Sequence, residues 1–133
     1  MSEPRRRTVR DYMSSALVTV SPETDVLAAM QKLQDARISG APVVDARGNL
    51  VGMLTQRDSL DVALHAVYHG EPAGRVADYM SAPVATLPAD TSLLDGIEAF
   101  RHSRFRRFPV VDGTRLVGQI SRRDLIRAIL DFA

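Results

Sequence analysis

The chain has no cysteine, few aromatic residues (5%) and no long apolar run. The lack of cysteine excludes disulfides, thiol catalysis and cysteine-based zinc sites. The longest apolar runs fall far short of the roughly 20 residues that span a bilayer. A secretory signal would require an apolar stretch after the N-terminal arginines, and the sequence has none there. We therefore expect a cytoplasmic protein with no membrane contact.

The charge is nearly balanced, with 17 basic and 16 acidic residues and a net charge of +1. Neither half has the basic excess of a dedicated nucleic-acid binder, so that function is disfavoured. The chain also lacks a nucleophile with an adjacent base and a glycine-rich phosphate loop, which argues against an enzyme. Its 133 residues are enough for a compact core without a disulfide or metal.

The chain contains one internal duplication. Three blocks of the first half return in the same order in the second half, with one residue missing from the turn before the last block. The blocks are Val9–Ser14 with Val76–Ser81, Pro42–Asp45 with Pro109–Asp112, and Leu50–Gly52 with Leu116–Gly118. We divide the chain into a flexible tail (1–8), a first repeat (9–68), a Gly- and Pro-containing linker (69–75) and a second repeat (76–133).

Each repeat has the hydrophobic pattern of a β-α-β-β-α unit. In the first repeat we expect strands at 17–20, 41–45 and 50–54, one helix capped by Thr24, and another helix from about Thr55. The second repeat predicts strands at 84–87, 108–112 and 116–120, a helix around 94–100 and a last helix to about 130. The fold class is therefore α+β. Two units that each expose an apolar face are expected to pack about a pseudo-twofold axis.

The duplicated motifs resemble a tandem pair of cystathionine-beta-synthase (CBS) domains, or Bateman module, of the stand-alone type. The resemblance rests on Asp-Tyr-Met at each repeat start, on Gly40–Asp45 with Phe108–Asp112, and on Gly52–Asp58 with Gly118–Asp124. It implies a regulatory sensor that binds AMP, ADP or ATP, or else S-adenosylmethionine or NAD, in clefts between the two repeats. It further implies a homodimer, a partner protein that receives the signal, no required cofactor and no catalysis.

The chemistry of the motif residues supports an adenosine ligand. One carboxylate can accept hydrogen bonds from both ribose hydroxyls, and Asp58 and Asp124 are the acids for this role. Thr55 and Ser121 stand at expected helix starts, where free N–H groups favour a phosphate. The same Thr-x-x-Asp and Ser-x-x-Asp spacing also approximates a capping box, so capping alone remains the alternative at both sites.

The resemblance also assigns residues to two clefts, each with the acidic motif of one repeat and a wall from the other. The first cleft would hold Leu54, Thr55, Asp58, Ala82, Val84, Phe105, Arg106, Arg107 and Phe108. The second cleft would hold Ser15, Leu17, Ile38, Ser39, Gly40, Ala41, Ile120, Ser121 and Asp124. Because arginine suits bidentate phosphate contact, Arg106 and Arg107 place the phosphorylated ligand in the first cleft.

Two functions of other classes stay open. A ligand-free interaction module would use its helical faces, and a weak nucleic-acid binder would use the arginines between Arg101 and Arg107. Arg101 and Arg104 also suit a helix C-terminus, and Arg5–Arg7 suit a solvated tail. The apolar residues that remain for a dimer interface above about 1,000 Å² are Leu60, Leu64, Leu125, Ile126, Ile129 and Leu130.

A metal site has weak support in the sequence. His65 and His69 have the spacing of one zinc-binding helix face, but only the distant His102 could add a third imidazole. Because zinc sites need three or four ligands, we expect no metal and a surface or packing role for this pair.

Overall fold

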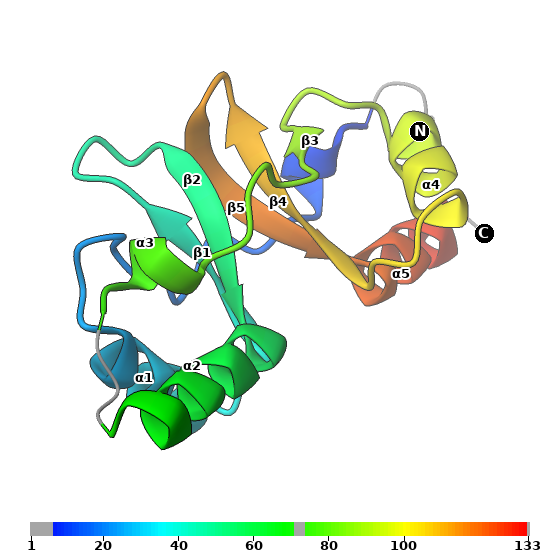
Figure 1. Ribbon diagram of the computed structural model, residues 1–133. Coiled ribbons are helices and arrows are strands. Elements are labelled where there is room, and N and C mark those ends of the chain that lie inside the picture. The colour runs from blue at the N-terminus through cyan, green and yellow to red at the C-terminus, as the bar shows by residue number, and fades with distance from the viewer. Residues whose placement is uncertain (1–6, 71–73, 133) are drawn as a thin grey trace. The chain divides into compact units, whose positions relative to one another are not determined.

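The structure, a computed structural model, describes residues 7–70 and 74–132 (Figure 1). Most of the predicted tail (1–8) and the middle of the predicted linker (69–75) lie outside the described residues. The elements in chain order are η1 (Val9–Asp11), α1 (Val26–Ala36), β1 (Gly40–Val44), β2 (Leu50–Thr55), α2 (Gln56–His69), α3 (Val76–Tyr79), β3 (Leu87–Pro88), α4 (Leu93–Arg101), β4 (Arg107–Asp112), β5 (Arg115–Ser121) and α5 (Arg122–Phe132).

The chain forms two compact units that do not coincide with the two sequence repeats. One unit, called here the N-repeat unit, is Val18–Val84. The other, the C-repeat unit, combines Ala85–Ala133 with Met1–Leu17. Each unit therefore contains the body of one repeat together with the opening segment of the other. Figure 1 shows this in colour, because the blue N-terminal segment lies beside β4 and β5, and green α3 lies with α1 and α2.

The N-repeat unit is built on the β1–β2 hairpin. The two strands are antiparallel with Gly40 opposite Thr55, and Val20 adds a parallel bridge to Val43. Helices α1 and α2 pack against each other, and α2 also packs on β2. The core consists of aliphatic side chains from all of these elements: Val20, Val26, Ala29, Leu33, Ala41, Val43, Leu54, Val62 and Val76.

The turn of this hairpin is held by Asp45. Its carboxylate accepts backbone hydrogen bonds from Arg47 and Asn49, both at 2.9 Å. The bond from Asn49 is the main cause that lowers the pKa of Asp45 below its usual value, and the bond from Arg47 adds to it. This turn joins the two strands that were expected at 41–45 and 50–54.

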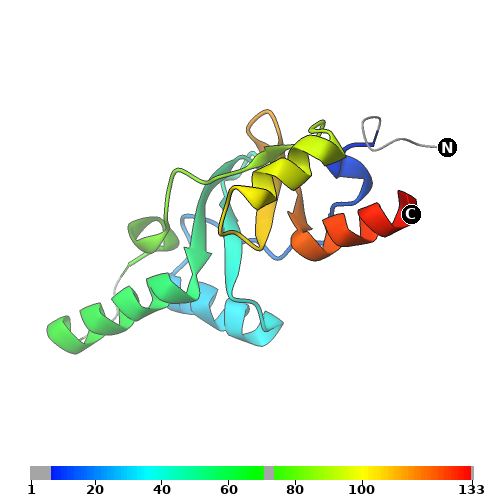
Figure 2. The same ribbon diagram turned by 90° about the vertical axis from the view of Figure 1, so that its right-hand side faces the viewer.

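The C-repeat unit has a three-stranded sheet in the order β3-β4-β5. Leu87 of β3 pairs in parallel with Val110, and β4 and β5 are antiparallel with Arg107 opposite Ser121. Helices α4 and α5 pack against each other, which Figure 2 shows from the side. The core contains a T-shaped ring pair, Phe100 with Phe108, whose centroids are 4.8 Å apart. This is the β-α-β-β-α order predicted for the second repeat.

The repeated opening segments are structural inserts into the neighbouring repeat. Val9 and Val76 are both fully buried, Val9 in the core of the C-repeat unit and Val76 in that of the N-repeat unit. The following Met-Ser crosses a strand glycine: Ser14 bridges Gln119 beside Gly118, and Ser81 bridges Met53 beside Gly52. The Val and Met-Ser of this motif are thus explained by packing.

We predict that Gly118→Ala destabilises the fold by about 1–3 kcal/mol, the range for overpacking. A Cβ at this position would overlap Met13 Sδ and approach the Ser14 carbonyl oxygen to 2.9 Å, and this oxygen belongs to a bridged backbone. Gly52→Ala should cost less, because its Cβ would lie 3.1 Å from the Ser81 carbonyl oxygen. Urea unfolding curves measure both changes, and a parental midpoint for Gly118→Ala would contradict the packing argument.

Several expected details differ from the structure. The strand at 17–20 is reduced to the single bridge at Val20, and the strand at 84–87 is displaced to Leu87–Pro88. Helix α1 is capped by Asp25, whose carboxylate accepts from the Ala28 N–H at 3.1 Å, and not by Thr24.

Helices α1 and α4 also carry apolar residues that face outward. Leu27 and Leu94 are 42% and 46% exposed. The core is reached instead by Ala29, two residues after Leu27 in α1, and by Leu93, the residue before Leu94 in α4.

Candidate functional site

The first motif acid, Asp58, lies in the first turn of α2, directly after the strand end at Thr55. Thr55 Oγ1 accepts a hydrogen bond from the Asp58 N–H at 3.3 Å. Asp58 Oδ2 accepts from the Thr55 N–H at 2.7 Å and from the Thr55 hydroxyl at 3.0 Å. These bonds confirm the capping box, and they engage only one carboxylate oxygen.

The second oxygen of Asp58 is the one that a ligand could use. Within residues 7–70 and 74–132, Asp58 Oδ1 accepts one long hydrogen bond, 3.4 Å, from the hydroxyl of Ser81 in the opening segment of the second repeat. The residue is only 7% exposed. Buried carboxylates are rare unless they are paired, yet no cation is paired with Asp58 within the described residues. Capping and ligand contact are therefore compatible at this residue.

The second motif acid, Asp124, has the same cap and a different surrounding. Ser121 Oγ accepts from the Asp124 N–H at 3.1 Å, and Asp124 Oδ2 accepts from the Ser121 N–H at 2.9 Å. Asp124 Oδ1 is paired with Arg127, whose Nη2 lies 3.3 Å away. The same guanidinium nitrogen donates to the Tyr12 carbonyl at 3.4 Å. The two motif acids thus have different partners at Oδ1, the Ser81 hydroxyl for Asp58 and the Arg127 guanidinium for Asp124.

The arginines expected at the phosphate, Arg106 and Arg107, lie at the start of β4. Both side chains are exposed, and neither has an acidic partner in the part of the chain that the structure describes. The backbone before them is held by Arg122, which donates to the Phe105 carbonyl at 3.1 Å. Two guanidinium groups are therefore presented from an anchored segment.

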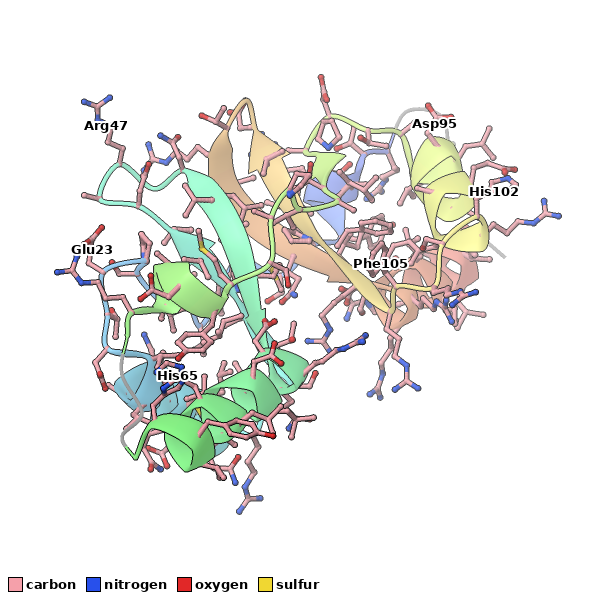
Figure 3. All side chains as sticks on the ribbon, in the orientation of Figure 1. Glu23, Arg47, His65, Asp95, His102 and Phe105 are labelled. Carbon is pink, nitrogen blue, oxygen red and sulfur yellow. The ribbon has the colours of Figure 1, made fainter. Side chains whose placement is uncertain are left out.

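Phe105, labelled in Figure 3, precedes these arginines and is 52% exposed. Its ring makes an edge contact with Phe108, with centroids 5.5 Å apart. Phe108 itself is buried and forms part of the core. The exposed ring is thus supported from below, which leaves an aromatic surface beside the arginine pair.

The remaining residues assigned to the clefts fall into two groups. The side chains of Leu54, Ala41 and Ile120 are fully buried in the cores, so they could offer only backbone atoms to a ligand. The others are exposed or half-buried: Ser15, Leu17, Ile38, Ser39, Gly40, Ala82 and Val84. Within the N-repeat unit, Ser39 accepts a backbone bond from the Gln56 N–H at 2.9 Å, so 38–40 lie beside the start of α2.

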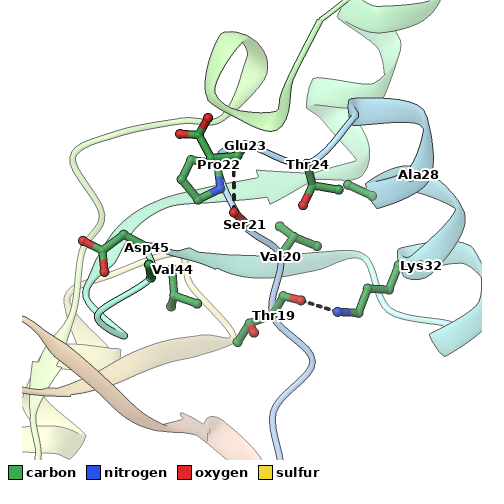
Figure 4. Close-up of a pocket in the computed structure, with 12 residues that line it drawn as sticks. Thr19, Val20, Ser21, Pro22, Glu23, Thr24, Ala28, Lys32, Val44 and Asp45 are labelled. Carbon is green, nitrogen blue, oxygen red and sulfur yellow. Dashed lines mark hydrogen bonds between the residues drawn. The ribbon is translucent and has the colours of Figure 1, made fainter.

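A separate cavity of about 630 Å³ lies in the N-repeat unit, at the end of β1 away from Gly40 (Figure 4). Loop 19–24, Lys32 of α1 and Asp45 line it. The charged side chains of this cavity already have partners: Lys32 Nζ donates to the Thr19 carbonyl at 2.6 Å, Asp45 holds the hairpin turn, and Glu23 is paired with Arg75 at 2.8 Å.

The two histidines at zinc-like spacing contact each other. The ring centroids of His65 and His69 are 4.4 Å apart, and His65 meets Tyr79 edge-on at 6.4 Å. No group of three or more metal-ligating side chains occurs among the described residues. The described helices include none long and apolar enough to cross a membrane.

Comparison with known proteins identifies the family. The CBS domain family matches residues 9–62 and again residues 76–131, which together make up most of the chain. This chain belongs to the CBS domain family. The two matched segments lie within the two sequence repeats, and the α+β fold agrees with solved CBS-pair structures.

Named relatives cover almost the whole chain. The CBS domain-containing protein YhcV of Bacillus subtilis is 32% identical over 88% of this chain and 81% of its own length. MJ1225 of Methanocaldococcus jannaschii is 28% identical over 91% of this chain, which spans only 42% of that relative. The crystal structure of CBSX2 in complex with AMP has a TM-score of 0.79 at 31% identity, and it covers 94% of this chain and 97% of its own.

Two residues at the motif acids were not singled out from the sequence. Ser81 was recognisable only as part of the duplicated opening motif, and its contact with Asp58 depends on the exchange of opening segments. Arg127 was recognisable by aligning the repeats, because Asp61 stands at the corresponding position of the first repeat.

Proposed function

We propose that this CBS pair is a regulatory module that binds an adenosine-containing ligand, with AMP as the first choice among AMP, ADP and ATP. It would act by binding and without turnover, and it would pass the signal to a partner protein. The single observation that carries the proposal is Asp58, a buried acid with one oxygen free of strong partners. The AMP complex of the related CBSX2 supports the choice of ligand.

In this proposal, which takes the composition of the first cleft from the family resemblance, three groups recognise three parts of the ligand. Asp58 Oδ1 accepts from the ribose hydroxyls after the long bond from Ser81 is released. Arg106 and Arg107 hold the phosphate, because unpaired guanidinium groups bind phosphate with charge-assisted hydrogen bonds. The supported ring of Phe105 provides a face for the adenine, and stacking of a base on an aromatic ring is favourable for any base.

A ligand screen by thermal unfolding tests the proposal directly. AMP should raise the melting temperature in a concentration-dependent way, since a ligand that binds only the folded state stabilises it by mass action. ADP, ATP, S-adenosylmethionine and NAD form the comparison set, and GMP controls for non-specific phosphate binding. If no adenosine compound shifts the transition at millimolar concentration, the alternative of a ligand-free interaction module is favoured.

We further propose that the protein is a homodimer, since apolar side chains lie exposed on helices in both units. On α2 these are Leu60, Leu64, Val67 and Tyr68, and on α5 they are Ile126, Ile129 and Leu130. Leu125, expected in this set, is instead buried in the core. An apolar groove of about 400 Å³ along α4 and α5 adds to the exposed apolar area of the C-repeat unit. Exposed apolar patches of this kind mark interaction sites.

We predict a mass of twice 14.6 kDa by light scattering at micromolar concentration. Ile129→Glu should reduce the mass to that of one chain, because a charge buried in an apolar interface is strongly unfavourable. Leu27→Glu, at a comparably exposed position on α1, serves as the control and should stay dimeric. A parental protein that scatters as a single chain would overturn the proposed dimer.

A further inference from the structure

The two motif acids differ at the oxygen that capping leaves free. In α2, the partner of Asp58 Oδ1 among the described residues is the Ser81 hydroxyl, at 3.4 Å. In α5, Asp124 Oδ1 is paired with the guanidinium of Arg127 at 3.3 Å. A ribose diol needs this oxygen, because Oδ2 of each acid is already bound to the backbone N–H that begins the helix.

The two occupants are not equally easy to displace. A serine hydroxyl can rotate and donate elsewhere, so a ribose hydroxyl can replace it at small cost. Arg127 is a cation, and its Nη2 is also held by the Tyr12 carbonyl, so a neutral diol must compete with an ion pair anchored at a second point. The Asp124 side chain is 19% exposed and the Arg127 side chain 64%, which limits the strength of the pair.

The two repeats can be compared position by position around the motif acids. The Ser/Thr, the acid and the cap geometry are retained in both copies, while the residue three positions after the acid is Asp61 in one copy and Arg127 in the other. Asp61 is exposed and makes no ion pair within the described residues. The two sites therefore carry opposite charges at one equivalent position.

We propose that Arg127 is a positioning residue that keeps the second motif acid closed to ribose, so that Asp58 alone receives an adenosine ligand at low concentration. This inference rests on the proposed function and adds which of the two acids is available and why. The difference in availability between Asp58 and Asp124 is thus assigned to the ion pair between Arg127 and Asp124.

The test measures adenosine binding by calorimetry in an Asp58→Asn background, where only the second acid can act. Adding Arg127→Gln should raise the affinity about two- to fivefold, the upper part of the range for a half-exposed ion pair. Arg123→Gln removes the same charge from the same helix without touching an acid, and it should change nothing. Arg127→Lys keeps the cation and should stay close to the Asp58→Asn parent.

The reciprocal change tests the same rule at the first acid. Asp61→Arg should lower adenosine affinity of the parental chain about two- to fivefold, whereas Asp61→Gln should not. A gain of affinity on removing Arg127 cannot arise from lost stability, which would only weaken binding.

The outcomes separate this inference from the proposed function. If the parental chain binds adenosine but Arg127→Gln brings no gain, the role of Arg127 is overturned and the proposed function stands. If neither the parental chain nor any variant binds an adenosine compound, both are overturned.

Discussion

Replacing Asp58 by Asn is expected to weaken AMP binding about ten- to a hundredfold, with a smaller loss of stability. The substitution keeps the size and one carbonyl oxygen, which can still accept the capping bond from Thr55. It removes the charge that best receives two ribose hydroxyls, and each tenfold corresponds to about 1.4 kcal/mol. Calorimetric titration with AMP measures the affinity, and urea unfolding measures the separate capping cost, about 0.5–2 kcal/mol.

The matched control is Asp124→Asn, which makes the same change at an acid with the same cap. Because Arg127 already occupies Asp124 Oδ1, this variant should lose mainly stability and keep its AMP affinity. The reverse pattern, with AMP bound normally by Asp58→Asn and poorly by Asp124→Asn, would show that the ligand uses the other acid. A stability loss without a binding loss in both variants would reduce the two motifs to helix caps.

Local chemistry made much of this fold predictable from the sequence. The hairpins and the starts of α2 and α5 follow from alternating apolar residues, turn residues and a hydroxyl followed by an acid, all of which act over a few positions. The segment 17–20 has the same apolar character, but only Val20 finds a strand partner. A strand requires a neighbour, and a propensity pattern cannot supply one.

The exchange of opening segments illustrates what local patterns miss. Helices η1 and α3 are too short for any hydrophobic period, and nothing in Val9 or Val76 tells which repeat will bury it. The strand glycines Gly52 and Gly118 are the sequence feature that reflects this exchange, because the backbone of a Met-Ser segment passes close to each of them. The contact of Ser81 with Asp58 depends on the same exchange. The difference made by Arg127 can be recognised only when the two copies are compared.

The second large effect is expected at the phosphate. If Arg106 and Arg107 hold it, AMP should bind more tightly than adenosine by about 1.5–3 kcal/mol, the contribution of hydrogen bonds to charged groups. Both guanidinium groups are exposed and lack acidic partners within the described residues, so no ion pair has to be broken first. Added salt should weaken AMP binding more than adenosine binding, because salt screens the charge interaction.

The variant Arg106→Gln with Arg107→Gln should bring AMP to the affinity of adenosine while adenosine itself is unaffected. Arg104→Gln, an exposed arginine just before this segment, is the charge-matched control and should retain the preference for AMP. Calorimetry with both ligands at two salt concentrations separates local contact from general attraction. If parental AMP and adenosine affinities are equal, the arginines do not face a phosphate. If Arg104→Gln abolishes the preference as fully as the double variant, net charge and not these two side chains sets it.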